Sequence, residues 1–278
     1  MTNTTDTYWD VDGVSLQTFA MNIQTLGGTR SSPAPFRGDD ITIPGRPGQI
    51  WMPKEVDAKT VELAMWVRGA NSDGTIPTLG SDQRDLYDDN LRTLQHLLHT
   101  PGRQFTLTKR FRIGGVLYSA SALGEYAGGL EPSMIGRKAS TFTVDIKITA
   151  GYFYNDVVTQ MTLVNGDNNF NFITDGPSSN VVITIEGARH NVTIRNKTRG
   201  MQVQYPGTLN AGDQVVLDVA DFISTTTPDG VAPFDSSVDI LHSGAVEWLS
   251  IQNGLNVINL TSDSGAGTVI LQARGAFH

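Results

Sequence analysis

The stretch from Asn180 to Val219, NVVITIEGARHNVTIRNKTRGMQVQYPGTLNAGDQVVLDV, decides the fold expected for the second half of the chain. It consists of short runs rich in β-branched residues, each bounded by Gly, Asn, Asp or Pro. Strand signals that recur about every 10 residues between such turn residues are typical of a β-sandwich or a jelly roll. The same pattern continues to the end of the chain without a helical period. We therefore predict that the second half is a β-sandwich.

The first half combines strands with one helix. Lys59–Val67, KTVELAMWV, alternates apolar and other residues with the period of a strand. From Ser81 to Gly102, SDQRDLYDDNLRTLQHLLHTPG, the leucines instead recur at spacings of three and four. With Ser81 as the N-cap and Thr100-Pro101-Gly102 as the stop, this predicts one amphipathic helix of about four to five turns. Its apolar face is expected to contain Leu86, Leu91 or Tyr87, Leu94, Leu97 and Leu98.

The change of pattern also predicts a domain boundary near Asp156, after the aromatic cluster Tyr152–Tyr154. The expected organisation is a mixed domain over 1–156 and a sandwich over 157–278. Each part is long enough for a hydrophobic core of its own. The fold class predicted for the whole chain is mainly β with one main helix.

Composition excludes several classes of function. The 278 residues include 20 Lys and Arg against 28 Asp and Glu, a net charge of −8 that argues against sequence-specific DNA binding. The absence of cysteine excludes disulfides, thiolate metal sites and cysteine nucleophiles. The N-terminus MTNTTDTYWDVDG lacks the features of an export signal, and no run of about 18 apolar residues occurs. We expect a chain that is made in the cytoplasm and does not insert into a membrane.

Two glycine-rich segments, Ile41–Lys54 (ITIPGRPGQIWMPK) and Gly128–Ser140 (GGLEPSMIGRKAS), do not match phosphate-binding loops. Neither has the spacing of a Walker or Rossmann loop opening a helix. Gly45 and Gly48 are interpreted as part of a connection between strands. The second segment is interpreted as a mobile or partner-binding loop.

No catalytic or metal site is predicted. His96 and His99 lie three apart near the end of the helix without an acidic residue to complete a metal triad. Asn165–Asn171, NGDNNFN, lacks the order of a calcium loop and is interpreted as a turn. No nucleophile elbow or zinc signature occurs, and nothing in the sequence pairs two carboxylates for glycoside hydrolysis. We expect neither enzymatic activity nor a cofactor.

Three aromatic residues of the second half, Tyr205, Phe234 and Trp248, are candidates for contact with a sugar or a partner. Trp248 stands just before a turn and can equally be a core residue. These residues support an alternative function, a lectin-like module that recognises cell-wall polysaccharide.

The order of parts resembles the distal tail proteins of long-tailed, non-contractile bacteriophages, often described as minor tail proteins. The resemblance is carried by IPGRPGQIW, VELAMWVRGANSDG, the helix LYDDNLRTLQHLL, the strand FTLTKRF and the run STFTVDIKITAGYFYND in the first half. In the second half it is carried by the stretch quoted first and by VEWLSIQNGLNVINL. It covers nearly the whole chain.

The resemblance implies a structural protein of the virion, located at the tail tip. The first domain would be a belt that forms a hexameric ring, and the second a galectin-like sandwich. The implied partners are further copies of the chain, the tail tube protein, the tail hub, the tape measure protein and receptor-binding proteins. DNA would pass through the ring without sequence-specific contacts, and Lys109, Arg110 and Arg112 in KRFR are the residues expected to face that lumen.

Overall fold

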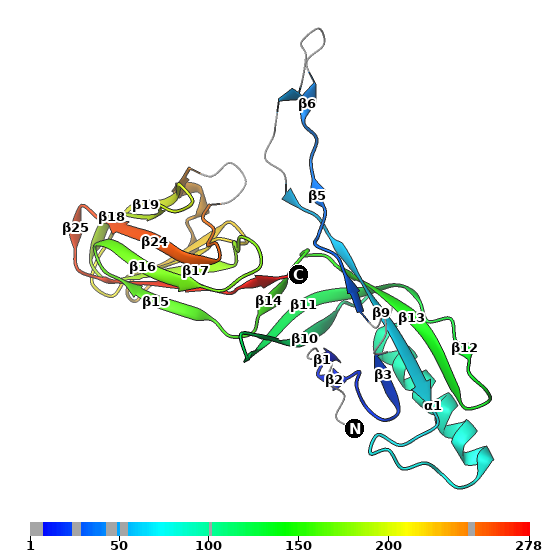
Figure 1. Ribbon diagram of the computed structural model, residues 1–278. Coiled ribbons are helices and arrows are strands. Elements are labelled where there is room, and N and C mark those ends of the chain that lie inside the picture. The colour runs from blue at the N-terminus through cyan, green and yellow to red at the C-terminus, as the bar shows by residue number, and fades with distance from the viewer. Residues whose placement is uncertain (1–7, 24–28, 43–48, 51–54, 100–101, 244–247) are drawn as a thin grey trace. The chain divides into compact units, whose positions relative to one another are not determined.

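The computed structural model describes residues 8–23, 29–42, 49–50, 55–99, 102–243 and 248–278. It divides into two compact units: unit 1 comprises residues 1–153 together with His278, and unit 2 comprises residues 154–277 (Figure 1). The division lies three residues before the boundary expected at Asp156. Both units consist mainly of strands, and one long helix occurs among the described residues. The predicted fold class, mainly β with one main helix, is confirmed.

Unit 1 is built on one large antiparallel sheet. Its main path runs through β2 (Val14–Ser15), β1 (Tyr8–Val11), β10 (Phe105–Ile113), β11 (Val116–Gly129), β13 (Ala139–Ile148), β9 (Lys59–Arg68) and β3 (Met21–Ile23). Among its shorter strands, β4 (Thr29–Ser31) pairs with β9 and β12 (Ser133–Met134) pairs with β13. In β9 the apolar residues at alternate positions of the predicted strand, Val61, Leu63, Met65 and Val67, are all fully buried. The period-2 pattern therefore placed the core face of this strand correctly.

The helix α1 (Gly80–Leu98) covers the predicted segment, but the predicted cap is wrong. Leu79 occupies the N-cap position, and Ser81 lies inside the first turn, where its hydroxyl donates to the Asp82 carboxylate at 3.1 Å. The buried residues of the helix are Tyr87, Leu94 and Leu98. Leu86, Leu91 and Leu97 are only partly buried, so the apolar face is narrower than predicted.

The helix docks on the sheet through a close backbone approach. A Cβ atom on Gly69, just beyond β9, would lie 1.8 Å from the Gln83 carbonyl oxygen, so only glycine fits there. Asn90 of the helix donates its side-chain amide to the carbonyls of Arg68 and Ala70, both at 2.9 Å. These contacts fix the helix against the end of β9.

Residues 36–56 of unit 1 contain two further strand pairs. β5 (Phe36–Arg37) pairs with β8 (Glu55–Val56), and β6 (Ile41–Thr42) pairs with β7 (Gln49–Ile50), both antiparallel. Gly45 and Gly48, interpreted as part of a connection between strands, lie outside the described residues. The second glycine-rich segment includes β12, which returns antiparallel on β13.

Unit 2 is a sandwich of two six-stranded antiparallel sheets. One runs β15 (Thr159–Leu163), β26 (Thr268–Ala273), β17 (Val181–Glu186), β20 (Gln214–Asp218), β21 (Ile223–Thr227) and β22 (Phe234–Asp235). The other runs β16 (Gly166–Phe172), β24 (Gly254–Thr261), β18 (Arg189–Asn196), β19 (Met201–Leu209) and β23 (Leu241–His242), with β25 (Ser264–Gly265) paired to β18. Two strands remain: β14 (Phe153–Asn155) contains the division between the units, and β27 (Ala276–Phe277) is the last strand.

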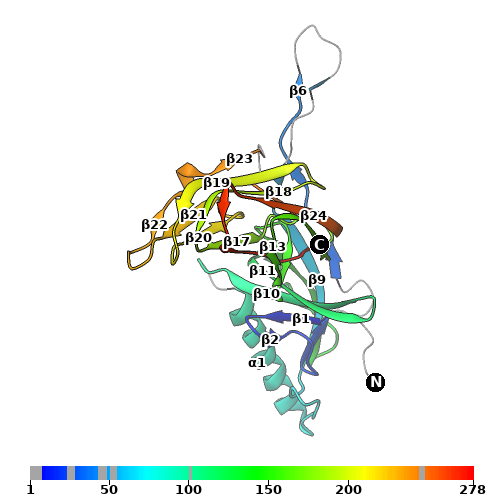
Figure 2. The same cartoon turned by 90° about the vertical axis from the view of Figure 1, so that its left-hand side faces the viewer.

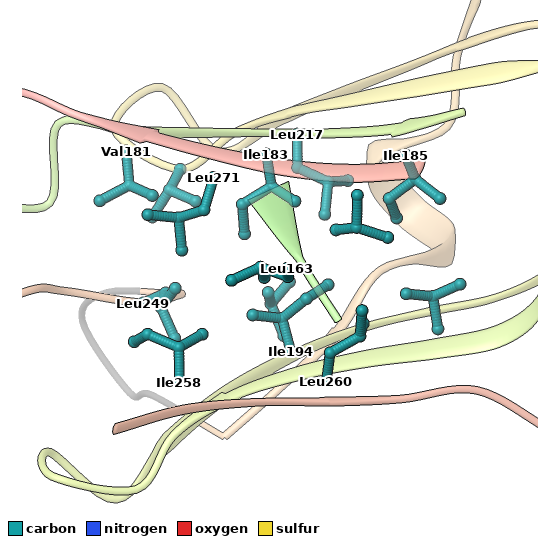
Figure 3. Close-up of a cluster of buried hydrophobic side chains, with 14 of the residues drawn as sticks. Leu163, Val181, Ile183, Ile185, Ile194, Leu217, Leu249, Ile258, Leu260 and Leu271 are labelled. Atoms are coloured by element: carbon teal, nitrogen blue, oxygen red, sulfur yellow. The ribbon is translucent and has the colours of Figure 1, made fainter. Parts of the chain in front are cut away.

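The inner faces of the two sheets form one apolar core. Figure 3 shows Ile183, Leu217 and Leu271 from the first sheet opposite Ile194 and Ile258 from the second, and all five are fully buried. Burial alternates along each strand, as the repeated runs of the quoted stretch predict. The sandwich expected for the second half is therefore present.

Asn165–Asn171 forms a turn and the start of β16. The Asn168 side chain accepts a hydrogen bond from the main-chain N–H four residues earlier at 2.9 Å, and donates to the carbonyls four and two residues earlier at 2.8 and 3.1 Å. Asn256 makes the same three bonds at the start of β24, at 3.1, 2.8 and 3.1 Å. The interpretation as a turn therefore holds for the start of the segment, whereas residues 166–171 lie in β16.

Candidate functional site

The described residues offer no centre for metal chemistry. Within those ranges no group of three or more His, Asp or Glu side chains is arranged to hold a metal ion. His99 instead packs edge-on against Tyr126, with ring centroids 5.3 Å apart. No helix in the described part of the chain is long and apolar enough to cross a membrane. The residues singled out in the sequence are therefore followed to the surfaces and cores on which they lie.

The basic strand β10 divides its charges between two faces. Leu107 and Lys109 lie on the buried face, whereas Arg110 and Arg112 point outward. Lys109 is only 7% exposed, so it does not present its ammonium group on a surface. The prediction that Lys109 faces a lumen is wrong, because the period of the strand, and not the run of charges, decides where each side chain points.

Lys109 belongs to an aromatic cluster inside unit 1. Its ammonium group lies 4.8 Å from the ring centre of Phe111 and 4.9 Å from that of Phe153, and it donates a hydrogen bond to the main-chain oxygen of His278. Lys59, also buried, lies 5.0 Å from the same Phe153 ring. Cation–π contacts and a main-chain acceptor compensate the desolvation of these cations. Lys109 thus has a structural role.

The hairpin formed by β10 and β11 presents the other two arginines beside an apolar tip. Arg110 forms an ion pair with the buried Asp10 at 2.5 Å, and Arg112 donates to the Gly115 carbonyl at 2.9 Å. The turn is closed by Gly114 and Gly115, both with positive φ. The exposed apolar side chains at its end are Ile113, Val116 and Leu117. We call Arg110, Arg112 and these three residues the hairpin tip.

The sheet of unit 1 also has two open edges. Among the described strands, β2 ends the sheet on one side and β3 and β4 end it on the other. An unpaired strand edge offers main-chain donors and acceptors to a neighbouring chain. Together with the hairpin tip, these edges are the features of unit 1 that suit contact with further subunits.

The aromatic candidates of unit 2 separate into core and surface. Tyr205 is 8% exposed and Trp248 is 4% exposed, and both belong to the sandwich core. Gly207 lies close enough to the Tyr205 ring that a Cβ atom there would be 2.6 Å from the tyrosine oxygen. Tyr205 and Trp248 are thus too buried to stack on a sugar, and the prediction that they contact a ligand is wrong. Phe234 is 50% exposed on the edge strand β22.

Charge is distributed unequally between the units. Residues 1–153 contain 15 Lys and Arg against 16 Asp and Glu, whereas residues 154–277 contain 5 against 12. From residue 200 to residue 273 there is no Lys or Arg and there are eight acidic residues. The acidity of the chain is therefore a property of unit 2.

The fold is similar to that of a solved phage protein. The solved structure of SPP1 Dit (gp 19.1) matches 98% of this chain and 99% of its own length, with a TM-score of 0.62 and 14% sequence identity. That protein is described as a paradigm of the hub adsorption apparatus in phages that infect Gram-positive bacteria. This likeness confirms, for the fold, the resemblance to phage distal tail proteins.

Two further structures are matched over nearly their whole length but less closely. They are the phage p2 baseplate in its activated conformation with Sr, with a TM-score of 0.40 and 10% identity, and the same baseplate with Ca, with a TM-score of 0.39 and 9% identity. This chain covers 97% and 98% of the matched chains, and they cover 96% and 97% of it. No protein-family model matches the sequence. No curated protein matches it either.

Proposed function

We propose that this chain is a structural protein of a phage tail tip that forms a hexameric ring between the tail tube and the tip hub or baseplate. Unit 1 is the ring-forming belt, and unit 2 is a galectin-like sandwich that supports attachment to the host. The observation that carries the proposal is the similarity of fold to SPP1 Dit over 98% of the chain. The proposed partners are the tail tube, hub, tape measure and receptor-binding proteins.

The surfaces of unit 1 support a ring. In a ring, one surface of each copy contacts a different surface of the next copy. When the ring closes, every copy has both of these surfaces covered. The sheet has two such open edges, and the hairpin tip has apolar side chains that a neighbour would cover. Arg110 and Arg112 remain candidates for the lumen, where they would form a nonspecific electrostatic surface for DNA.

The first test is the mass of the full chain in solution, measured by light scattering after size exclusion. A six-membered ring of 30.0 kDa chains gives a mass of about 180 kDa, as closure of a cyclic assembly requires. The double variant Val116→Ser/Leu117→Ser should weaken the ring, whereas Leu123→Ser, further along the same strand, serves as the matched control. If the chain stays at 30 kDa and is also absent from purified virions of the phage that encodes it, the proposal fails.

The lectin-like alternative has lost two of its three aromatic candidates. Stacking on a sugar requires an exposed ring, and only Phe234 meets that condition among the three. A glycan array probed with the full chain decides this alternative. Binding that disappears in Phe234→Ala would support it.

A further inference from the structure

One side of the sandwich is bordered by a single continuous segment. The edge strand of one sheet, β22, runs into the short helix η1 (Ser237–Asp239) and then into the edge strand of the other sheet, β23. Figure 2 shows β20, β21 and β22 side by side, with β23 beyond them. Phe234, Val238 and Leu241 of this segment are exposed, and Val238 is 94% exposed.

Two further apolar side chains, Phe222 and Ile223, lie beside this segment. The next residue, Ser224, donates its main-chain N–H to the Ser237 hydroxyl at 2.7 Å, which places the start of β21 against η1. Both apolar side chains are exposed, and the Phe222 ring contacts the buried Trp248 edge-on at 5.7 Å. We call the five residues Phe222, Ile223, Phe234, Val238 and Leu241 the edge strip.

The edge strip is held in place from beneath. The buried Ser236 hydroxyl accepts a hydrogen bond from the Thr226 hydroxyl at 2.8 Å and lies 2.8 Å from the Ser224 hydroxyl. The main-chain N–H of Ser236 donates to the Ser224 carbonyl at 2.8 Å, and Ile240 is buried. Because Ser236 and Ile240 fill the inner positions, Phe234, Val238 and Leu241 are left outside. Their exposure is therefore built into the segment.

Carboxylates flank the edge strip and no cation accompanies them. Asp221, Asp235 and Asp239 are exposed, and none of them forms an ion pair within the described residues. Hydrogen bonds from the Ser237 side chain and main chain lower the pKa of Asp235, so this carboxylate stays ionised under ordinary conditions. The surrounding sequence from 200 to 273 contains no Lys or Arg. The surface combines an apolar centre with three exposed carboxylates.

We propose that the edge strip binds a second protein of the tail tip, through a surface on which Lys and Arg side chains surround apolar ones. Apolar contact at the centre of an interface supplies affinity, and charges of opposite sign at its rim guide association and exclude wrong partners. The short edge strands β22 and β23 also offer main-chain groups to an added strand. The three carboxylates disfavour nucleic acid as the occupant. This inference rests on the proposed function, because it places the partner in the virion.

The test uses virions of the phage that encodes the chain. A photo-crosslinking amino acid replaces Val238 in one variant and Leu255 in a control, because Leu255 is also exposed but lies on β24, outside the edge strip. Crosslinked peptides are identified by mass spectrometry after irradiation of purified particles. We expect crosslinks from position 238 to one other tail protein, at a segment containing Lys or Arg, and none to that segment from position 255.

The charge requirement is tested in the same particles. In Asp235→Asn/Asp239→Asn the yield of the crosslink from position 238 should fall by about tenfold, the effect of losing roughly 1.4 kcal/mol of binding free energy. Asp263→Asn, an acidic residue outside the edge strip, should leave the yield unchanged.

The outcomes separate this inference from the proposed function. If the chain is absent from virions, the proposed function itself fails. If the chain is present but position 238 crosslinks to nothing, to a second copy of this chain or to an acidic segment, the assignment of a basic partner is overturned and the proposed function stands.

Discussion

Unit 1 and unit 2 differ in how completely they bury their sheets. In unit 2 two sheets cover each other's inner faces, and a continuous apolar cluster lies between them (Figure 3). In unit 1 the buried face includes Lys59 and Lys109, the sheet has open edges among the described strands, and apolar side chains lie at the hairpin tip. A closed core needs no neighbour, whereas open edges and exposed apolar groups are stabilised when another chain covers them. The comparison shows a core closed between two sheets in unit 2 and an open sheet in unit 1, and each unit also exposes apolar side chains, at the edge strip and at the hairpin tip.

The largest expected effect is in the core of unit 2. Ile183→Ala should lower the free energy of unfolding by about 2–5 kcal/mol, because it removes buried methyl and methylene groups and leaves a cavity. Thr184→Ala, on the outer face of the same strand, should cost less than about 1 kcal/mol. Urea unfolding measures both values, and hydrogen exchange should show lost protection in residues 154–277. Equal effects of the two variants would contradict the closed core.

The next effect concerns the helix of unit 1. Gly69→Ala should cost about 1–3 kcal/mol, because its Cβ atom would overlap the Gln83 carbonyl and force the helix away from β9. Gly80→Ala, at the start of the helix, meets only the flexible end of Lys138 and should change stability by less than about 1 kcal/mol. Thermal unfolding of both variants compares them. A harmless Gly69→Ala would show that the helix does not depend on this approach.

A smaller effect distinguishes the two roles considered for the basic strand. Lys109→Ala should destabilise unit 1 by about 1–3 kcal/mol through lost packing and cation–π contacts, whereas Lys109→Met should cost less than about 1.5 kcal/mol. Arg112→Ala should leave stability within about 0.5 kcal/mol of the parent. Chemical denaturation gives these values. If Lys109→Ala were neutral while it slowed DNA ejection, the residue would serve the lumen after all.

The smallest effect is an ion pair on the outer face of unit 2. Lys197 lies 2.6 Å from Asp167, and its hydrogen bond, followed by that of Asn259, lowers the pKa of Asp167 below the usual 3.8. A carboxylate with a lowered pKa stabilises the fold above 3.8, and this contribution is lost as the pH falls through its pKa in the folded state. The free energy of unfolding of Asp167→Asn should therefore be slightly lower than that of the parent at pH 7, and equal to it at a pH below the pKa of Asp167 in the folded state. Stability measured against pH for Asp167→Asn and Lys197→Gln checks this, and a difference that grows in acid would refute it.

Local periodicity was sufficient to predict the type of element where a single spacing of apolar residues runs through a segment. The alternation in Lys59–Arg68 identified the buried face of the strand, and the three- and four-residue spacings identified the buried face of the helix in part. The N-cap was missed because it depends on the backbone at Leu79, whose side chain makes no capping bond. Tyr205 was wrongly considered as an exposed contact residue. It lies two positions from the buried Val203, and therefore on the same face of the strand, which the sequence does indicate.

The site residues were less predictable because their surroundings come from distant segments. Period 2 places Lys109 on the face of Leu107, but the acceptor of its hydrogen bond is 169 residues away at His278. Likewise, the sequence contains the run without Lys or Arg, but nothing in its local pattern puts Val238 outside and Ile240 inside. These placements follow from the way the edge of the sandwich is assembled.

The two turns that begin β16 and β24 in unit 2 have a consequence for how the outer face of these strands can change. Asn165-Gly-Asp-Asn168 and Asn253-Gly-Leu-Asn256 begin two strands that pair antiparallel, so one turn lies at each end of the pair. The side-chain bonds of Asn168 and Asn256 to residues four and two positions earlier hold each turn from within. The turns are thus held by Asn168 and Asn256. The outward side chains of these strands, such as Asn169 and Val257, can be substituted without removing those bonds. The chemistry of this face can therefore change while the sandwich keeps its form.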